Sequence, residues 1–183
     1  LVLSQARKRI KKFKKEGKKF DDKLSSKLIN NLNFKLTENQ ISIIREINND
    51  LKSDYKMFRL LQGDVGSGKT IISFIAASNV IKSNCQVVLM APTEILAKQH
   101  YLLAKNIFKS ENIKIEFLSG KIKSREKKII ETKLTKGRID FLIGTHALFQ
   151  KNIIFNKLGL VIIDEQHQFG VKQRIELSNK GGK

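Results

Sequence analysis

The chain has 183 residues, of which 40% are hydrophobic, enough for one globular domain with a hydrophobic core and an additional segment. No run of about eighteen apolar residues and no short apolar leader is present, so we expect neither a membrane span nor a secretory signal, and the single cysteine, Cys85, excludes an internal disulfide and a cysteine zinc site. The net charge of +19, from 36 basic and 17 acidic residues, fits a polyanionic partner, although a genome poor in G and C would also enrich the Lys, Ile and Asn of this chain.

A basic segment comes first along the chain. Apolar residues recur at helical spacing over residues 3–13, which predicts a helix that ends near Lys15. Nine of the thirteen residues 7–19 are Lys or Arg, a density typical either of an arm that binds DNA or of a solvated linker helix, and we favour the linker. A second short helix is expected around the leucines of residues 24–32. We therefore interpret residues 1–33 as a basic helical linker segment.

From residue 34 to residue 183 short apolar strands alternate with helices, which predicts one α/β domain with a mainly parallel sheet and helices on both faces. The helix over residues 69–82 is apolar nearly all round and should be buried. The predicted strands are Met57–Leu61, Gln86–Met90, residues 113–117, Phe141–Ile143 and Leu160–Ile163, and the predicted helices between them are Lys69–Lys82, Thr93–Lys109 and Ile122–Lys136.

The strongest motif is the sequence GDVGSGKT, which fits the pattern G-x-x-x-x-G-K-[ST] fully and stands between a predicted strand and a predicted helix. In such a loop the glycines let backbone N–H groups point inward at phosphate oxygens, and the helix that follows adds the positive end of its dipole. Lys69 would then reach the β- and γ-phosphates of ATP, and the Thr70 hydroxyl would bind Mg²⁺. A glycine-rich turn can match by chance, but this context favours a nucleotide site. Its candidate residues are Gly63, Asp64, Val65, Gly66, Ser67, Gly68, Lys69 and Thr70.

Two adjacent carboxylates, Asp164 and Glu165, follow the last predicted strand. Alone, such a pair is usually a solvated strand end. Together with the phosphate loop upstream, it predicts that Asp164 holds Mg²⁺, commonly through water, and that Glu165 orients and deprotonates the attacking water. Lys69, Asp164 and Glu165 are therefore the candidate catalytic residues.

The segment Phe34–Gln40 precedes the phosphate loop and ends in a glutamine. The Gln40 amide can offer a donor and an acceptor together, which matches the N6 and N7 edge of adenine. Thr37 also has the position of an N-cap for a helix that begins there. Both roles can hold at once, and taken alone the motif favours the cap.

In this order the motifs resemble those of the superfamily-two helicases and, within them, the RecG family of DNA translocases. The motifs that carry the resemblance are Phe34–Gln40, Gly63–Thr70, Ala91–Ala97 (APTEILA), Gly144–Leu148 (GTHAL) and Asp164–His167 (DEQH). The resemblance runs from about Phe34 to the C-terminus, and its most specific parts are Leu61–Gly68, the pair Gln99 and His100, and the segment Phe169–Arg174 after DEQH. Gln168 departs from the family, which typically carries Arg there, and this puts the strength of coupling in doubt.

The resemblance implies a RecA-like P-loop domain that uses ATP and Mg²⁺ as the first of two motor lobes. Its partners would be branched or forked DNA, a second RecA-like lobe and a wedge domain of the same full-length chain. We expect a bacterial-type cytoplasmic protein associated with the nucleoid. Because the chain starts at Leu1 and stops at Lys183 in an apparent loop, we expect a fragment that is nearly inactive alone.

The family also implies roles for further residues. Phe34 and Gln40 would contact adenine, and Gln166 and His167 would couple the nucleotide site to DNA. The DNA backbone would be contacted by Pro92, Thr93, Gly144, Thr145 and His146. Thr93 is in any case expected to cap a helix, and we expect His100 to be structural.

Four alternatives stay open. A transcription-repair coupling translocase usually has Asp-Glu-Glu-His after its strand and Phe in place of Ser67. An RNA helicase of the DEAD-box group would have Asp in place of His167. A regulatory nucleotide-binding module is disfavoured by the intact motifs, and a small P-loop kinase would need an acceptor site and a lid that we do not find in the sequence.

Overall fold

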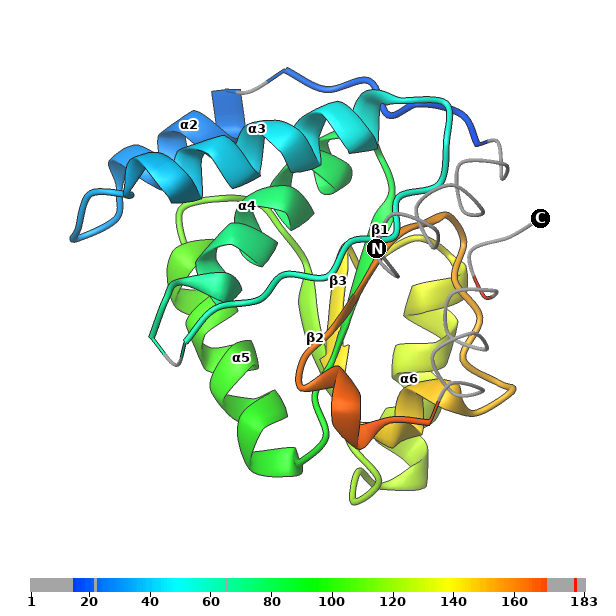
Figure 1. Cartoon of the computed structure of the whole chain (residues 1–183). Coiled ribbons are helices and arrows are strands. Elements are labelled where there is room, and N and C mark those ends of the chain that lie inside the picture. The colour runs from blue at the N-terminus through cyan, green and yellow to red at the C-terminus, as the bar shows by residue number, and fades with distance from the viewer. Residues whose placement is uncertain (1–14, 22, 65, 171–179, 181–183) are drawn as a thin grey trace. The chain divides into compact units, whose positions relative to one another are not determined.

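The computed structural model describes residues 15–21, 23–64, 66–170 and 180, so the helix expected over residues 3–15 lies almost entirely outside the described residues (Figure 1). By its contacts the chain divides into two compact units, Leu1–Ser83 and Asn84–Lys183, and we describe each by itself. This division does not coincide with the boundary expected at residue 33, which stays a prediction. No helix in the described part of the chain is long and apolar enough to cross a membrane.

The first unit contains the helices α2 (Lys23–Asn30), α3 (Glu38–Lys52) and α4 (Lys69–Lys82), and both α2 and α3 pack against α4 (Figure 1). The N-terminus of α3 is closed by a capping box. The Thr37 hydroxyl accepts from the Gln40 N–H at 3.2 Å, and the Gln40 side-chain oxygen accepts from the Thr37 N–H at 2.8 Å. The buried apolar residues of α2 and α3 are Leu24, Leu28, Ile44, Ile47 and Leu51.

The strand expected over Met57–Leu61 is not formed, because residues 56–64 carry no helix or strand assignment. An apolar extended segment becomes a strand only when a neighbour pairs with its backbone N–H and C=O groups, and no strand is assigned among the described residues of this unit. The segment is held by a side chain instead. Arg59 donates to the Asp50 carboxylate at 2.6 and 3.0 Å and to the Glu46 carboxylate at 2.6 Å, which ties the segment to α3.

The second unit contains a parallel four-stranded sheet in the order β2-β3-β1-β4. The strands are β1 (Gln86–Met90), β2 (Ile115–Leu118), β3 (Phe141–Gly144) and β4 (Leu158–Ile163). Val87 of β1 lies opposite Phe141 of β3, and Leu89 lies opposite Ile162 of β4. The central strands β1 and β3 are buried at every residue, whereas every residue of the edge strand β4 is half-buried.

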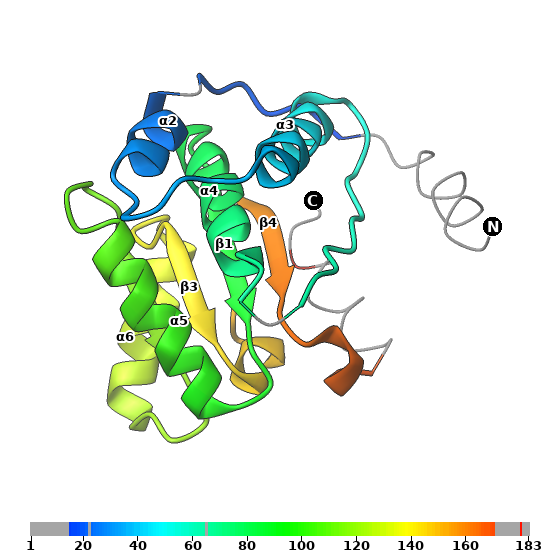
Figure 2. The same ribbon diagram turned by 60° about the vertical axis from the view of Figure 1, so that its left-hand side comes forward.

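Helices cover both faces of this sheet. The helix α5 (Glu94–Ile107) contacts β2 and β3, and α6 (Ser124–Thr135) contacts β2. Figure 1 views the sheet nearly edge-on, with α5 on one side and α6 on the other. The turns after β3 and β4 contain the short 3-10 helices η1 (His146–Phe149) and η2 (Gln166–Gln168). The predicted α/β class, with a parallel sheet and helices on both faces, is therefore confirmed (Figure 2).

One buried polar side chain joins several elements at the amino-terminal end of β1, which is the end of the sheet opposite the motif loops. Gln86, the first residue of β1, is 5% exposed. Its amide nitrogen donates to the carbonyl oxygens of Leu134 at 3.0 Å and Ile139 at 2.7 Å. Its amide oxygen accepts from the N–H groups of Asn156 at 2.7 Å and Lys157 at 3.1 Å. All four bonds of one amide thus join α6, the turn after it and the entry to β4.

Candidate functional site

The phosphate-loop motif leads directly into α4, as the sequence predicts. Gly66 and Gly68 have φ values of +83° and +84°, a left-handed backbone that L-residues rarely adopt. Gly68 is the N-cap of α4, and no side chain caps this end of the helix. Because the first N–H groups of a helix have no partner within the helix, the loop presents donors to an anion at the positive end of the helix dipole.

The lysine of the motif is folded back over its own loop. The Lys69 ammonium donates to the carbonyl oxygen of Gly63 and, at 2.8 Å, to that of Asp64. These carbonyls are neutral acceptors, whereas the phosphate oxygens of a nucleotide are charged and form stronger hydrogen bonds with an ammonium group. The loop therefore holds its lysine where phosphate oxygens can replace the carbonyls.

Gln40 is joined to the phosphate loop across 27 residues of sequence. Its side-chain nitrogen donates to the Ser67 carbonyl at 2.9 Å, while its side-chain oxygen belongs to the capping box of α3. A Cβ added at Gly68 would lie 2.5 Å from that same nitrogen, so the contact requires glycine at this position. Both ends of the Gln40 amide are thus engaged, but each has capacity for a second hydrogen bond, and recognition of adenine by Gln40 stays a prediction. Phe34, the other expected adenine contact, is 50% exposed.

The carboxylate pair lies in the second unit, at the carboxyl end of β4. The Asp164 N–H donates to the Met90 carbonyl at 2.9 Å, so the parallel pairing of β1 and β4 fixes the backbone position of Asp164. The Asp164 carboxylate accepts from the Glu165 N–H at 3.0 Å. Glu165 has φ 46° and ψ 52°, a left-handed conformation that is uncommon for a residue with a side chain and is often found at functional sites.

His100 contacts one of the two carboxylates, a contact that the sequence did not reveal. It lies on α5, 64 residues before Asp164, and its Nε2 is 2.7 Å from the Asp164 Oδ2. The expectation that His100 is structural stays a prediction, and the structure adds that its hydrogen-bond partner is the proposed Mg²⁺ ligand. The coupling candidates Gln166 and His167 lie in η2, where His167 Nδ1 is 3.4 Å from Glu165 Oε2.

The loops expected to contact DNA follow β1 and β3, which are adjacent parallel strands. Met90 pairs with Gly144, and the Ala91 N–H donates to the Gly144 carbonyl at 3.0 Å. The structure thus brings Pro92 and Thr93 to the same sheet edge as the residues Gly144–His146. The Thr93 side chain accepts from the Leu96 N–H at 3.2 Å, which confirms it as the N-cap of α5.

The Thr145 hydroxyl is buried, whereas a hydroxyl that contacts the DNA backbone would have to be exposed. The residue is 3% exposed, and its Oγ1 is buried and has no hydrogen-bond partner among the described residues. In this conformation a phosphate cannot reach the hydroxyl. The contact predicted for Thr145 would need its loop to open. Gly144 beside it is required by packing, because a Cβ there would lie 2.1 Å from the Leu118 carbonyl oxygen.

A third strand end joins the same edge and was not predicted from the sequence. Glu94 accepts from the Ser119 hydroxyl at 3.2 Å and forms an ion pair with Lys121 at 3.0 Å. The hydrogen bond from Lys121 lowers the pKa of the Glu94 carboxyl below its ordinary value. Glu94 therefore links the loop after β1 to the loop after β2 and adds a basic side chain to this edge.

The two candidate metal ligands have the chemistry that Mg²⁺ requires. The candidate ligands, the Thr70 hydroxyl and the Asp164 carboxylate, are oxygen ligands, which Mg²⁺ prefers. Within the described ranges there is no group of three or more His, Cys, Asp or Glu residues that could hold a metal ion. Each ligand by itself, the Thr70 hydroxyl in the first unit and the Asp164 carboxylate in the second, would leave the rest of the coordination of a bound Mg²⁺ to phosphate and water oxygens.

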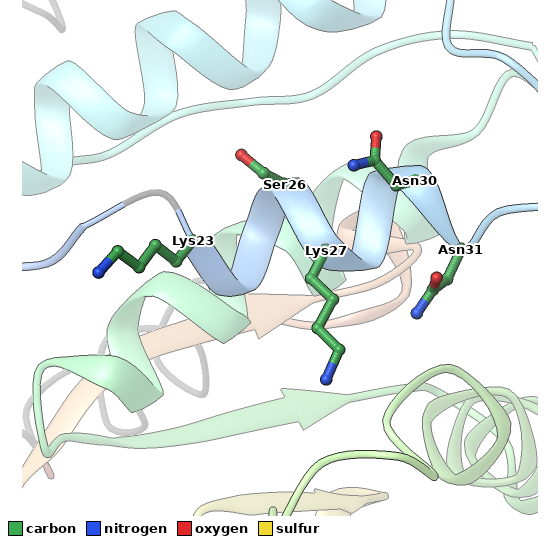
Figure 3. A pocket seen from close by; sticks show the side chains of 5 residues that line it. All are labelled: Lys23, Ser26, Lys27, Asn30 and Asn31. Atoms are coloured by element: carbon green, nitrogen blue, oxygen red, sulfur yellow. The ribbon is translucent and has the colours of Figure 1, made fainter.

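One surface depression is of a different kind. It measures about 650 Å³ and is lined by Lys23, Ser26, Lys27, Asn30 and Asn31. Figure 3 shows that these side chains project in different directions from α2 and from Asn31, which follows it, and do not converge on a common point. We therefore assign the functional site to the motif loops.

Comparison with known proteins gives the family. The model of the family described as DEAD/DEAH box helicase matches residues 37–180 of this chain. The chain belongs to the DEAD/DEAH box helicase family. This membership confirms the predicted helicase resemblance and places the phosphate loop and the Asp164–Glu165 pair in a helicase domain.

Individual relatives of this DEAD/DEAH box helicase domain point to one group. The ATP-dependent DNA helicase RecG of Aquifex aeolicus is 46% identical over 181 residues, which is 99% of this chain and 23% of the relative. RecG of Thermotoga maritima gives the same identity and coverage, and RecG of Bacillus subtilis is 45% identical over 89% of this chain. The chain spans about a quarter of the length of these relatives.

Solved structures agree with this grouping. A structure described as RecG bound to a three-way DNA junction superposes with a TM-score of 0.84 at 44% identity, over 93% of this chain and 23% of that chain. A hypothetical ATP-dependent RNA helicase from Sulfolobus tokodaii, at 19% identity and a TM-score of 0.55 over 87% of this chain and 45% of that chain, shows the same fold. The predicted RecA-like helicase fold and the resemblance to RecG are therefore confirmed.

Proposed function

We propose that this chain is the first, ATP-binding motor domain of a RecG-type DNA helicase, which couples ATP hydrolysis to the remodelling of branched DNA and stalled replication forks. The observation that carries the proposal is the complete pair of nucleotide motifs, the loop Gly63–Thr70 and the carboxylates Asp164 and Glu165, in a chain 46% identical to RecG over 99% of its length. Neither the fold nor either motif alone would favour DNA over RNA as the partner.

In this proposal the N–H groups of the phosphate loop and of the first turn of α4 bind the phosphates of ATP. Lys69 exchanges its bonds to the Gly63 and Asp64 carbonyls for bonds to the β- and γ-phosphates. Thr70 and Asp164 would hold Mg²⁺, and the chemistry that this ion supplies when bound is neutralisation of charge on the phosphate oxygens. Glu165 orients the attacking water and accepts its proton.

The DNA partner is proposed from the loops at the carboxyl edge of the sheet in the second unit. Pro92 and Thr93 follow β1, and Gly144 and His146 lie at and just after the end of the adjacent parallel strand β3, where open α/β sheets bind their ligands. The backbone N–H groups of such loops contact phosphates without reading sequence. Lys121, held by Glu94, would add a phosphate contact at the same edge.

We also propose that the remaining length of the protein supplies the other partners. Because this chain spans about a quarter of its RecG relatives, a second RecA-like lobe and a wedge domain would lie outside it. The second lobe would provide the arginines that stabilise charge on the transferring phosphoryl group, so the isolated chain should turn over ATP very slowly. A DNA motor whose single cysteine, Cys85, is buried suits a reducing cytoplasm.

The test measures ATP hydrolysis by the full-length protein without nucleic acid, with forked DNA and with structured RNA, beside a Lys69→Ala variant. Strong stimulation by forked DNA that disappears in Lys69→Ala supports a branched-DNA motor. Stimulation by RNA alone would move the protein to the RNA helicases. Absence of stimulation by either would leave a nucleotide-binding module and overturn the proposal.

A further inference from the structure

We infer that His100 is a positioning residue for the nucleotide site: its imidazole fixes the Asp164 carboxylate in the orientation that binds Mg²⁺. The inference rests on the proposed function, because it assigns Asp164 to that metal. His100 itself would touch neither the nucleotide nor the metal. It would act through the hydrogen bond of 2.7 Å between its Nε2 and the Asp164 Oδ2.

Both partners of this bond are held by backbone contacts of the second unit. His100 lies on α5, whose N-terminus is fixed by the Thr93 cap directly after β1. Asp164 lies directly after β4, and its N–H is bonded to the last residue of β1, Met90. The two side chains therefore approach from elements that start or end at the same strand terminus. The His100 side chain is 12% exposed and the Asp164 side chain 30% exposed, so this hydrogen bond is partly shielded from competing water.

The bond completes a pair of donors, one for each oxygen of the carboxylate. Oδ1 accepts from the Glu165 N–H at 3.0 Å, and Oδ2 faces the His100 Nε2. In this inference the Asp164 carboxylate is ionised and accepts, so Nε2 carries the hydrogen. Two donors on opposite oxygens restrict rotation of the carboxylate plane. Carboxylates that bind metals are commonly oriented by such hydrogen bonds, and loss of the donor typically lowers metal affinity about 10–100-fold.

A purely structural role is the competing explanation, because a buried histidine often only satisfies a neighbouring polar group. The two roles differ in what they predict. A structural bond would affect the stability of α5 and β4 and would change nucleotide binding equally with and without metal. A positioning bond would change only the metal-dependent part of nucleotide binding.

The experiment uses the full-length protein and a matched pair of variants, His100→Gln and His100→Asn. Gln places an amide N–H at about the reach of the imidazole Nε2, whereas Asn carries the same group one methylene closer to the backbone and cannot reach Asp164. The measurement is equilibrium binding of a fluorescent, non-hydrolysable ATP analogue during a titration with Mg²⁺, and again in EDTA. Gln99→Asn also shortens a side chain by one methylene, at an exposed position of α5, and controls for effects of such a change on the helix itself.

We expect His100→Asn to raise the Mg²⁺ concentration for half-maximal binding about tenfold or more, and His100→Gln to stay within about threefold of the unsubstituted protein. Binding in EDTA should be the same in all of them. The inference is overturned if His100→Asn shifts the Mg²⁺ midpoint less than about twofold, if Gln and Asn lose equally, or if binding falls equally in EDTA. If the unsubstituted protein binds no nucleotide, both the proposed function and this inference fail. If the unsubstituted protein titrates normally and His100→Asn shows no shift, only this inference fails.

Discussion

The side-chain amide of Gln40 donates to the backbone carbonyl of Ser67 at 2.9 Å, so a residue of the α3 capping box also holds the phosphate loop. The two functions use different atoms. The oxygen of the amide accepts from the Thr37 N–H, and the nitrogen donates to the loop. The sequence predicts the nucleotide-related role of Gln40 and the cap by Thr37, and the structure adds Gln40 to that capping box. The two roles of Gln40 can therefore be separated by substitution.

The first prediction uses Gln40→Glu. A glutamate keeps the acceptor that the capping box needs but removes the donor to Ser67 and to adenine. We expect α3 to stay intact and preference for ATP over GTP to fall about fivefold or more, the effect of about one hydrogen bond. Calorimetric titration of the full-length protein with each nucleotide measures this.

Thr37→Ala is the matched control for Gln40→Glu. It removes a cap worth about 1 kcal/mol but leaves the Gln40 donor in place, so stability should fall while the preference for ATP is retained. Equal ATP preference in Gln40→Glu and the unsubstituted protein would show that Gln40 serves only the helix and the loop.

A second prediction compares the two left-handed glycines of the phosphate loop. Gly66→Ala introduces only backbone strain of about 1–2 kcal/mol, because no atom of the described residues, apart from its chain neighbours, lies within 4 Å of the added Cβ. Gly68→Ala carries the same strain and also pushes against the Gln40 nitrogen at 2.5 Å. We expect hydrogen exchange in the loop and the first turn of α4 to rise more in Gly68→Ala, by about a further fivefold, and ATP binding to weaken in parallel. Equal exchange in the two variants would mean that the contact with Gln40 does not hold the loop.

Much of the second unit could be predicted from the sequence. The strand Gln86–Met90 has the predicted bounds, and the Thr93 cap is where the pattern places it. These features are local, because a continuous apolar run and a capping residue specify strand and helix start without knowledge of the rest of the chain. The prediction of a strand at Met57–Leu61 was wrong for the opposite reason. Its apolar pattern is local, but a strand also requires a partner, which no local pattern supplies.

Contacts between segments that are far apart in the chain could not be predicted from the sequence, for the same physical reason. Nothing in the residues around His100 indicates that its ring faces Asp164, since that depends on how α5 leaves β1 and where β4 ends. The burial of the Thr145 hydroxyl likewise depends on packing in three dimensions. The chemistry of Lys69 and Glu165, in contrast, could be expected because their motifs combine residue type with fixed spacing.

A third prediction concerns the buried amide of Gln86. Replacing it by leucine leaves the carbonyls of Leu134 and Ile139 and the N–H groups of Asn156 and Lys157 without this partner. Because each buried group left unsatisfied costs about 1–3 kcal/mol, the total should exceed about 3 kcal/mol. We expect faster amide exchange at Asn156, Lys157 and β1 in the full-length protein. Gln150→Leu, at an exposed glutamine, should leave exchange in β1 unchanged, and unchanged exchange in Gln86→Leu would refute the role of the network.

The last prediction separates binding from chemistry at Glu165. Glu165→Gln keeps the size of the side chain and the left-handed backbone at φ 46°, but the amide cannot accept a proton from water. We expect DNA-stimulated hydrolysis to fall about 10²–10⁴-fold, the usual contribution of a general base, while affinity for ATP changes little. Steady-state hydrolysis with forked DNA and equilibrium nucleotide binding give the two numbers, and Glu126→Gln on α6 serves as the control. A Glu165→Gln variant that retained more than about a tenth of the rate would assign proton transfer to another group, and the exposed His167, 3.4 Å from the Glu165 carboxylate, would be the next residue to replace.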